Sequence, residues 1–141
     1  MPKQWELTVD SRLKNLATIA DFVVEAAQAA DLNEKATFEV QMAVDEACTN
    51  VIKHSYRGEE NGKIALCCRR AEDNFVVTIR DYGQPFDPGA IPPPDTTCGL
   101  AERCNGGLGL YFMRRLMDEV CFHFDTEGNE LTMIKSIRRR A

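Results

Sequence analysis

The chain has 141 residues, a length typical of one domain with a core of ordinary size. Its 44% hydrophobic and 28% charged residues are typical of a soluble globular protein, and no apolar run is long enough to cross a membrane. The net charge of −5 argues against a general nucleic-acid binder, because phosphate contacts require a basic face. The N-terminus lacks a secretion signal. We therefore expect a single cytoplasmic domain over residues 1–141, with no membrane and no direct nucleic-acid partner.

The first half of the chain predicts one strand followed by two helices. Residues 5–9 alternate apolar and polar side chains, as a half-buried strand does. Apolar residues then recur at helical spacing over 13–30, and Asp10 or Ser11 can cap the start of this helix. A second helix is expected over 33–55, because its first residue is asparagine, a good N-cap.

The second half predicts two hairpins with a helix between them. Residues 64–68 and 75–79 read as strands joined by a turn at 72–74, a helix is expected over 108–117, and a closing hairpin over 120–124 and 131–137. We therefore expect an α/β fold, a two-layer sandwich whose mixed, mostly antiparallel sheet is covered on one face by helices.

Residues 82–105 differ in character from the rest of the chain. Five of the six prolines and six of the nine glycines lie between residues 82 and 109. A loop this long inside a compact domain is usually functional. We expect a lid over a site, because a linker between two domains would leave too few residues for a second core.

The predicted helix over 33–55 carries an acid and an amide on one stripe. Glu46 and Asn50 are four residues apart and therefore lie side by side. A carboxylate can accept a proton, and an amide oxygen is a ligand for a hard cation. A solvated helix face carries such pairs too, so the spacing alone leaves both readings open. An apolar face of the same helix is expected to pack inward, and it consists of Val40, Val44, Ala47 and Val51.

Two further segments have the composition of a nucleotide site. Asp81 ends a predicted strand and can accept a hydrogen bond from an exocyclic amine, while Gly83 lets a flat ring approach the backbone. An ordinary Asx turn is the alternative. The glycine-rich segment 106–109 opens a helix, whose free N–H groups suit phosphate. Its position late in the chain excludes a dinucleotide fingerprint, and the chain has no G-x-x-x-x-G-K-[ST] loop.

The six cysteines give no metal or disulfide signature. They contain no C-x-x-C pair, and the two histidines are not placed to complete a zinc set. We expect small buried thiols and some free ones. Cys98 and Cys104 lie in the expected lid and could be oxidised.

Taken in order, these segments resemble the N box, G1 box and G2 box of the GHKL (histidine-kinase-like) ATPase superfamily. Within it the chain is most similar to anti-sigma-factor serine/threonine kinases of the RsbW type, through residues 46–56 and through 106–113 with 116–118. The resemblance covers essentially the whole chain. One departure is Pro85, where many relatives carry a second glycine.

The resemblance implies a cofactor, ATP with Mg²⁺, and a role for each site residue. Glu46 would be the general base, and Asn50 would ligate Mg²⁺. Asp81 would hold the adenine amine, with Gly83 permitting close approach. The remaining nucleotide contacts would come from the backbone of Gly107, Leu108, Gly109 and Leu110 at the phosphates and from Thr132 on the adenine side.

The implied activity is that of an ATP-dependent serine/threonine protein kinase. It would phosphorylate a small anti-anti-sigma antagonist protein, sequester a sigma factor or comparable regulator, and form a homodimer. The alternative is a non-catalytic module in which ATP only sets the conformation that holds a partner. A sensor histidine kinase is disfavoured, because these residues contain no helical pair that carries a phosphorylatable histidine.

Overall fold

The computed structural model describes residues 4–84 and 107–137. The sheet has five strands in the order β1-β2-β3-β5-β4. Its strands are β1 (Gln4–Asp10), β2 (Lys63–Ala71), β3 (Asn74–Asp81), β4 (Glu119–Asp125) and β5 (Gly128–Ser136). The helices are α1 (Leu16–Ala29), α2 (Glu34–Asn50) and α3 (Gly107–Leu116), with a 3-10 turn η1 (Leu13–Asn15) and a π-helical turn η2 (Val51–Ser55).

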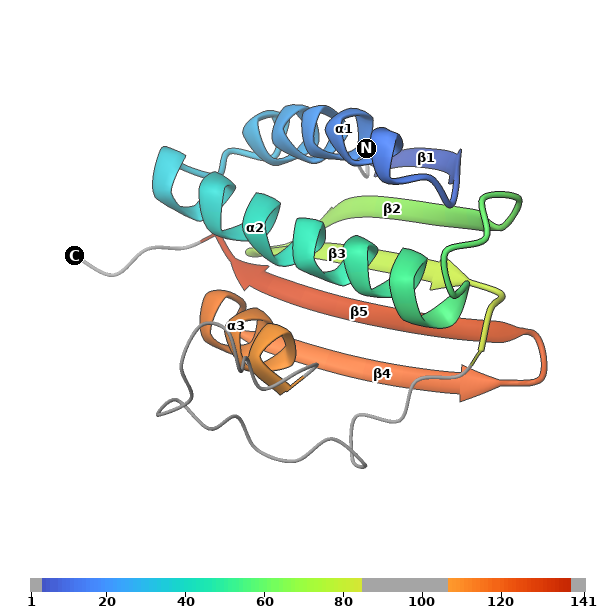
Figure 1. Cartoon of the computed structure of the whole chain (residues 1–141). Coiled ribbons are helices and arrows are strands. Elements are labelled where there is room, and N and C mark those ends of the chain that lie inside the picture. Colours follow the sequence, from blue (N-terminus) through green and yellow to red (C-terminus); the bar gives the residue numbers. More distant parts are fainter. Residues whose placement is uncertain (1–3, 85–106, 138–141) are drawn as a thin grey trace.

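The expected two-layer α/β sandwich is confirmed, with one correction. All four strand pairings of the described residues are antiparallel, so the sheet is not mixed. Figure 1 shows the three helices on one face of the sheet. The predicted lid over residues 82–105 falls largely outside the described residues, since only 82–84 belong to them.

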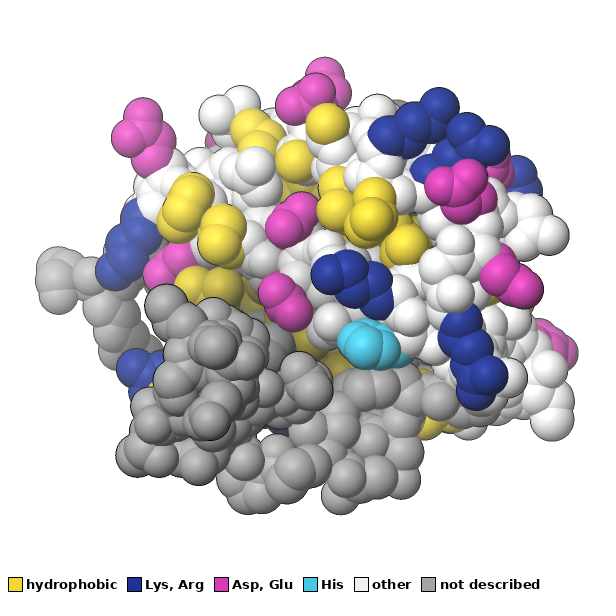
Figure 2. Space-filling view, in the orientation of Figure 1, with side chains coloured by type: hydrophobic (Ala, Val, Ile, Leu, Met, Phe, Trp, Pro, Cys, Tyr) yellow, Lys and Arg dark blue, Asp and Glu magenta, His cyan; other side chains and the backbone are white. Residues whose placement is uncertain are grey.

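The core lies between α2 and the middle of the sheet. Phe75, Val77 and Ile79 alternate along β3 and are at most 1% exposed, because side chains at every second strand position share a face. The predicted inward stripe of α2 is buried against them, and Val40 and Val44 are at most 1% exposed. Figure 2 shows hydrophobic side chains among charges of both signs on the outer side of the helices. The buried stripe of α2 and the charged side chains on the outer side make the helix layer amphipathic.

The second helix starts as predicted, but the first does not. The Asn33 side chain accepts a hydrogen bond from Ala36 N at 2.8 Å and caps α2. Neither Asp10 nor Ser11 caps the first helix. The hydroxyl of Ser11, which is fully buried, donates to Glu59 O and accepts from Gly62 N. Long-range bonds to the turn before β2 have therefore replaced the local cap.

The thiols of the described residues agree with the expectation for structural cysteines. Cys48 and Cys68 are fully buried, and burial raises the pKa of Cys68 to about 12, so both remain neutral thiols. Cys67 is half-buried and Cys121 is exposed, while Cys98 and Cys104 lie outside the described residues. Among the helices of the described residues, none is long and apolar enough to cross a membrane.

Ser11→Ala is expected to lower the free energy of unfolding by about 1 kcal/mol, because it removes the fully buried hydroxyl that bonds the Glu59 carbonyl and the Gly62 N–H. Urea unfolding followed by circular dichroism measures the change. Thr8→Ala, at an exposed position of β1, is the control and should cost about 0.5 kcal/mol or less. Equal, small costs for both variants would contradict the role assigned to Ser11.

Candidate functional site

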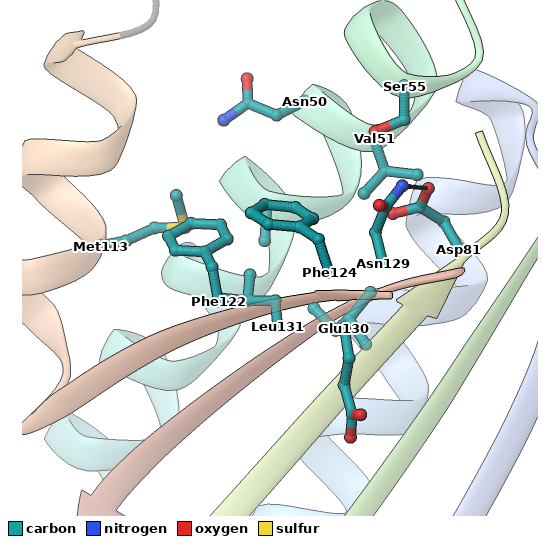
Figure 3. Close-up of a pocket in the computed structure, with 12 residues that line it drawn as sticks. Asn50, Val51, Ser55, Asp81, Met113, Phe122, Phe124, Asn129, Glu130 and Leu131 are labelled. Atoms are coloured by element: carbon teal, nitrogen blue, oxygen red, sulfur yellow. Dashed lines mark hydrogen bonds between the residues drawn. The ribbon is translucent and has the colours of Figure 1, made fainter. Parts of the chain in front are cut away.

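A pocket lies between the end of α2, the start of α3 and the sheet. The free space in it is about 460 Å³, counting the part that is open to solvent. Figure 3 shows Asn50 and Met113 at one side of this pocket and Asp81 with Asn129 at the other. It is lined by Ala47, Asn50, Val51, Ser55, Ile79, Asp81, Met113, Phe122, Phe124, Asn129, Glu130 and Leu131.

One end of the pocket holds a buried carboxylate. Asp81 is the last residue of β3 and is 4% exposed. Its Oδ1 accepts hydrogen bonds from Asn129 Nδ2 at 2.9 Å and from Gly83 N at 3.0 Å. Asn129 is the residue across from it on β5, and its amide also donates to Gly83 O at 3.1 Å. Asp81 is therefore held in a fixed orientation.

The surroundings of Asp81 work in opposite directions on its charge. Burial raises the pKa of Asp81 above its usual value, because a carboxylate loses hydration inside the protein. Hydrogen bonds from Asn129, Gly83 and the Ser55 side chain favour the carboxylate and limit the rise in pKa. Any further hydrogen-bond donor that enters the pocket would therefore stabilise the ionised carboxylate of Asp81.

The end of α2 and the end of β3 fit together only because residue 83 is glycine. A Cβ at Gly83 would lie 2.3 Å from Ser55 O, far inside van der Waals contact. The same carbonyl accepts a hydrogen bond from Gln84 N at 2.7 Å. Ser55 ends the π-helical turn η2, which follows Asn50 directly, and such turns are frequent at functional sites. The turn thus fixes Asn50 and Asp81 relative to each other.

The wall between these two ends is apolar and aromatic. Phe122 and Phe124 lie on β4 with their rings stacked at 6.2 Å, and Met113 extends toward them from α3 (Figure 3). An apolar slot ending in a carboxylate suits a flat heterocycle with an exocyclic amine. Sequence reasoning missed these three residues, although the alternation along residues 120–124 puts both phenylalanines on the covered face.

The structure brings some of the predicted site residues together and separates others. Asn50, Asp81 and Gly83 meet at the pocket or its rim. Glu46 lies one turn before Asn50 on α2, is half-buried and is not among the pocket-lining residues. The segment from Gly107 to Leu110 forms the first turn of α3, where the sequence predicts the start of a helix.

The expectation for Thr132 does not agree with the geometry. Thr132 pairs with Thr78 on β3 and with Cys121 on β4, on the sheet face opposite the helices. Asn129 lies three positions earlier on β5 and reaches the pocket. It is two residues from the buried Leu131, so both side chains point to the same face of the sheet. Asn129, and not Thr132, is therefore the residue of this part of β5 whose polar side chain lies beside Asp81.

The donor set fits a nucleotide better than a free metal ion. Asn50 offers a single neutral oxygen ligand, and the described residues contain no cluster of three or more His, Cys, Asp or Glu side chains. A hard cation takes six or more oxygen ligands. Mg²⁺ would therefore need phosphate oxygens and water in addition to Asn50, which is how magnesium is held in nucleotide sites.

Comparison with known proteins gives the family and the fold. Residues 9–135 match the family described as histidine kinase-like ATPase domain. The serine-protein kinase RsbW of Listeria monocytogenes is 35% identical, over 91% of this chain and 77% of its own length. RsbW of Bacillus licheniformis is also 35% identical, over 72% of this chain and 65% of its own length, so the chain spans less than two thirds of that relative.

A solved structure supports the same fold. The structure of the RsbU and RsbW domains of a Mycobacterium tuberculosis protein superposes with a TM-score of 0.71, covering 99% of this chain and 34% of that one. Its sequence is 18% identical to this chain, so the likeness concerns the fold.

We expect Asp81→Asn to leave the nucleotide-free protein as stable as the wild type or more stable at about pH 7. The variant avoids burying a charge, and its amide oxygen can still accept from Gly83 and Asn129. Because folding raises the pKa of Asp81, ionisation costs stability as pH rises above the usual carboxyl value of 3.8. The advantage of the variant should therefore shrink as pH falls toward that value.

Urea unfolding at several pH values between about 4 and 7.5 measures this difference. Asp21→Asn, on the exposed side of α1, is the control and should show no such trend. An Asp81→Asn protein that is clearly less stable than wild type near neutral pH would show that the hydrogen bonds to the carboxylate outweigh its burial.

Proposed function

Because the chain belongs to the histidine kinase-like ATPase family, we propose that it binds Mg²⁺-ATP and transfers the terminal phosphate to a protein serine or threonine. The observation that carries the proposal is the buried carboxylate of Asp81 at the end of an apolar, aromatic pocket that Asn50 also lines. The names of the curated relatives, serine-protein kinase RsbW, support protein as the phosphate acceptor.

Each residue has a role that its position supports. Asp81 accepts the hydrogen bond of the adenine amine, and Gly83 lets the segment after β3 pack against Ser55 at the rim of the pocket. The Asn50 side-chain oxygen would hold Mg²⁺, which when bound offsets phosphate charge. The N–H groups at the start of α3, over Gly107–Leu110, face no helical partner and can donate to phosphate oxygens.

Glu46 is proposed as the general base. The acceptor hydroxyl oxygen forms a bond to the terminal phosphorus, the bond from that phosphorus to the bridging oxygen breaks, and ADP leaves. The hydroxyl proton passes to the Glu46 carboxylate. Its place one helical turn before Asn50, half-buried at the surface of α2, lets a protein substrate reach it from outside.

We further propose that the acceptor is a small anti-anti-sigma antagonist and that the chain sequesters a sigma factor or a comparable regulator. The RsbW relatives support this assignment, and a homodimer is part of the same proposal.

A second candidate is a non-catalytic module in which bound ATP only sets the shape that holds a partner. One observation favours it: among the described residues, Glu46 does not line the pocket. The two candidates differ in whether phosphate is transferred, and they share the nucleotide site.

Nucleotide binding is expected to depend on Mg²⁺ and to prefer adenine. ATP at about a hundred times its Kd should stabilise the fold by roughly 2.7 kcal/mol. Thermal melts with ATP, GTP and ATP plus EDTA measure this shift. Asp81→Asn should lose most of the ATP shift, because its amide oxygen stays with Gly83 and Asn129 and an NH₂ donor replaces Oδ2, the oxygen left to accept from the adenine amine. Equal shifts with ATP and GTP would remove the support for an adenine site.

Glu46→Gln is expected to separate the enzyme from the binding module. It keeps the shape of the side chain and removes the base, so phosphate transfer should fall by about 10²–10⁴-fold while ATP affinity stays within a few-fold. Transfer from labelled ATP to the purified antagonist measures the rate, and calorimetry measures the affinity.

Asn50→Ala is the matched variant for this experiment and should weaken Mg²⁺-ATP binding itself, because a metal ligand is lost. Transfer by Glu46→Gln within a few-fold of wild type would mean that Glu46 is a polar surface residue, and the binding module would become the leading candidate.

A further inference from the structure

Lys135, near the end of β5, connects α2 with α3. Its Nζ lies 2.6 Å from Glu39 Oε1 on α2 and donates to Leu116 O, the last residue of α3, also at 2.6 Å. The two charged side chains are only 13% and 21% exposed, whereas those of the exposed Lys63–Asp10 pair are 61% and 45% exposed. A partly buried ion pair that also binds a backbone carbonyl is held in one geometry far more strongly than a surface pair.

The C-terminal end of α3 is anchored to β5 from both sides. Asp118, two residues after the helix, donates its N–H to Ile134 O at 2.8 Å and accepts at Oδ2 from Ser136 N at 2.6 Å. Lys135 lies between these two residues in sequence and bonds on the helix-covered face. A cation is also favourable at a helix C-terminus, because the helix dipole is negative there. This end of α3 is therefore a fixed point.

The groups assigned to the nucleotide lie at the opposite ends of the same elements. Lys135 lies across from Phe75 on β3. Phe75 precedes Asp81 by six residues of the strand, which is about 20 Å. Glu39 precedes Asn50 by eleven residues, about 16 Å along α2. Leu116 ends the helix that Gly107 begins. The helices α2 and α3 are thus joined at one end and carry the metal ligand and the phosphate loop at the other.

We propose that Lys135 and Glu39 are a positioning pair for the triphosphate, setting the first turn of α3 at the correct distance from Asn50. Neither residue touches the nucleotide, so both act through α3. This inference rests on the proposed function. The pair constrains only the phosphate end of the site, because Asp81 is held independently by Asn129 and Gly83.

Lys135→Met tests this role by removing the charge and keeping most of the side-chain volume. Calorimetry with adenosine and with Mg²⁺-ATP measures two affinities for each protein. The ATP affinity should fall about fivefold or more, the lower end of coupling between distant sites. The adenosine affinity should change less than twofold. Lys135→Arg should restore ATP affinity, because it keeps the cation and its donors.

Glu39→Gln gives a milder variant in case Lys135→Met does not fold, since its amide oxygen can still accept from Lys135. It should show a smaller ATP-specific loss. Lys63→Met removes the exposed ion pair with Asp10 and is the matched control, with neither affinity changed. Equal loss of adenosine and ATP affinity in Lys135→Met would reveal a general structural role and overturn the proposal.

Hydrogen exchange of the nucleotide-free proteins keeps this inference separate from the proposed function. Amides of α3 should exchange faster in Lys135→Met than in wild type, while those of α2 around Asn50 stay unchanged. Unchanged exchange in α3 would overturn the positioning role whether or not the wild type binds nucleotide. A wild type that binds neither adenosine nor ATP would refute the proposed function, while the exchange result would still decide whether the pair fixes α3.

Discussion

The burial of the Asp81 carboxylate is the constraint on which the rest of the site depends. A charge inside a protein is costly unless donors satisfy it. The donors here come from three separate parts of the chain: the Asn129 side chain on β5, the N–H of Gly83 after β3, and the Ser55 side chain at the end of η2. Asp81 can be buried only when all three segments are folded against one another, so the site and the fold form together.

The same segments are joined a second time by Tyr56. Its hydroxyl accepts from Tyr82 N at 2.8 Å and donates to Lys63 O at 2.6 Å, and its ring lies where a Cβ at Gly62 would be, 2.4 Å away. The residue after the π-helical turn therefore holds both the start of β2 and the segment after β3. This double connection explains why the helix end that carries Asn50 keeps its orientation at the edge of an open pocket.

Local patterns predicted most of the fold, and they failed where a long-range partner decides the outcome. Helical spacing gave the inward face of α2, since Val40 and Val44 are buried as expected. The cap at Ser11 was wrong because its hydroxyl binds a turn nearly fifty residues away, as its contact with Glu59 O shows. The prediction for Thr132 was wrong for a local reason. Alternation along β5 places the side chain of Thr132 on the face opposite Leu131, whereas Asn129 shares the face of Leu131.

The two ends of the pocket are prepared to different degrees, and this sets an order for binding. At one end, the Asp81 carboxylate is already buried and oriented by Asn129, so on the proposed function recognition of the adenine ring needs no rearrangement of Asp81. At the other end, Asn50 is half-exposed and offers one side-chain oxygen, which is too few to hold a hard cation without ligand oxygens from elsewhere. On the proposed function, the base is therefore recognised first, and the cation binds together with the phosphates that complete its coordination. In this arrangement the buried end gives specificity, and the exposed end leaves room for a protein hydroxyl to approach.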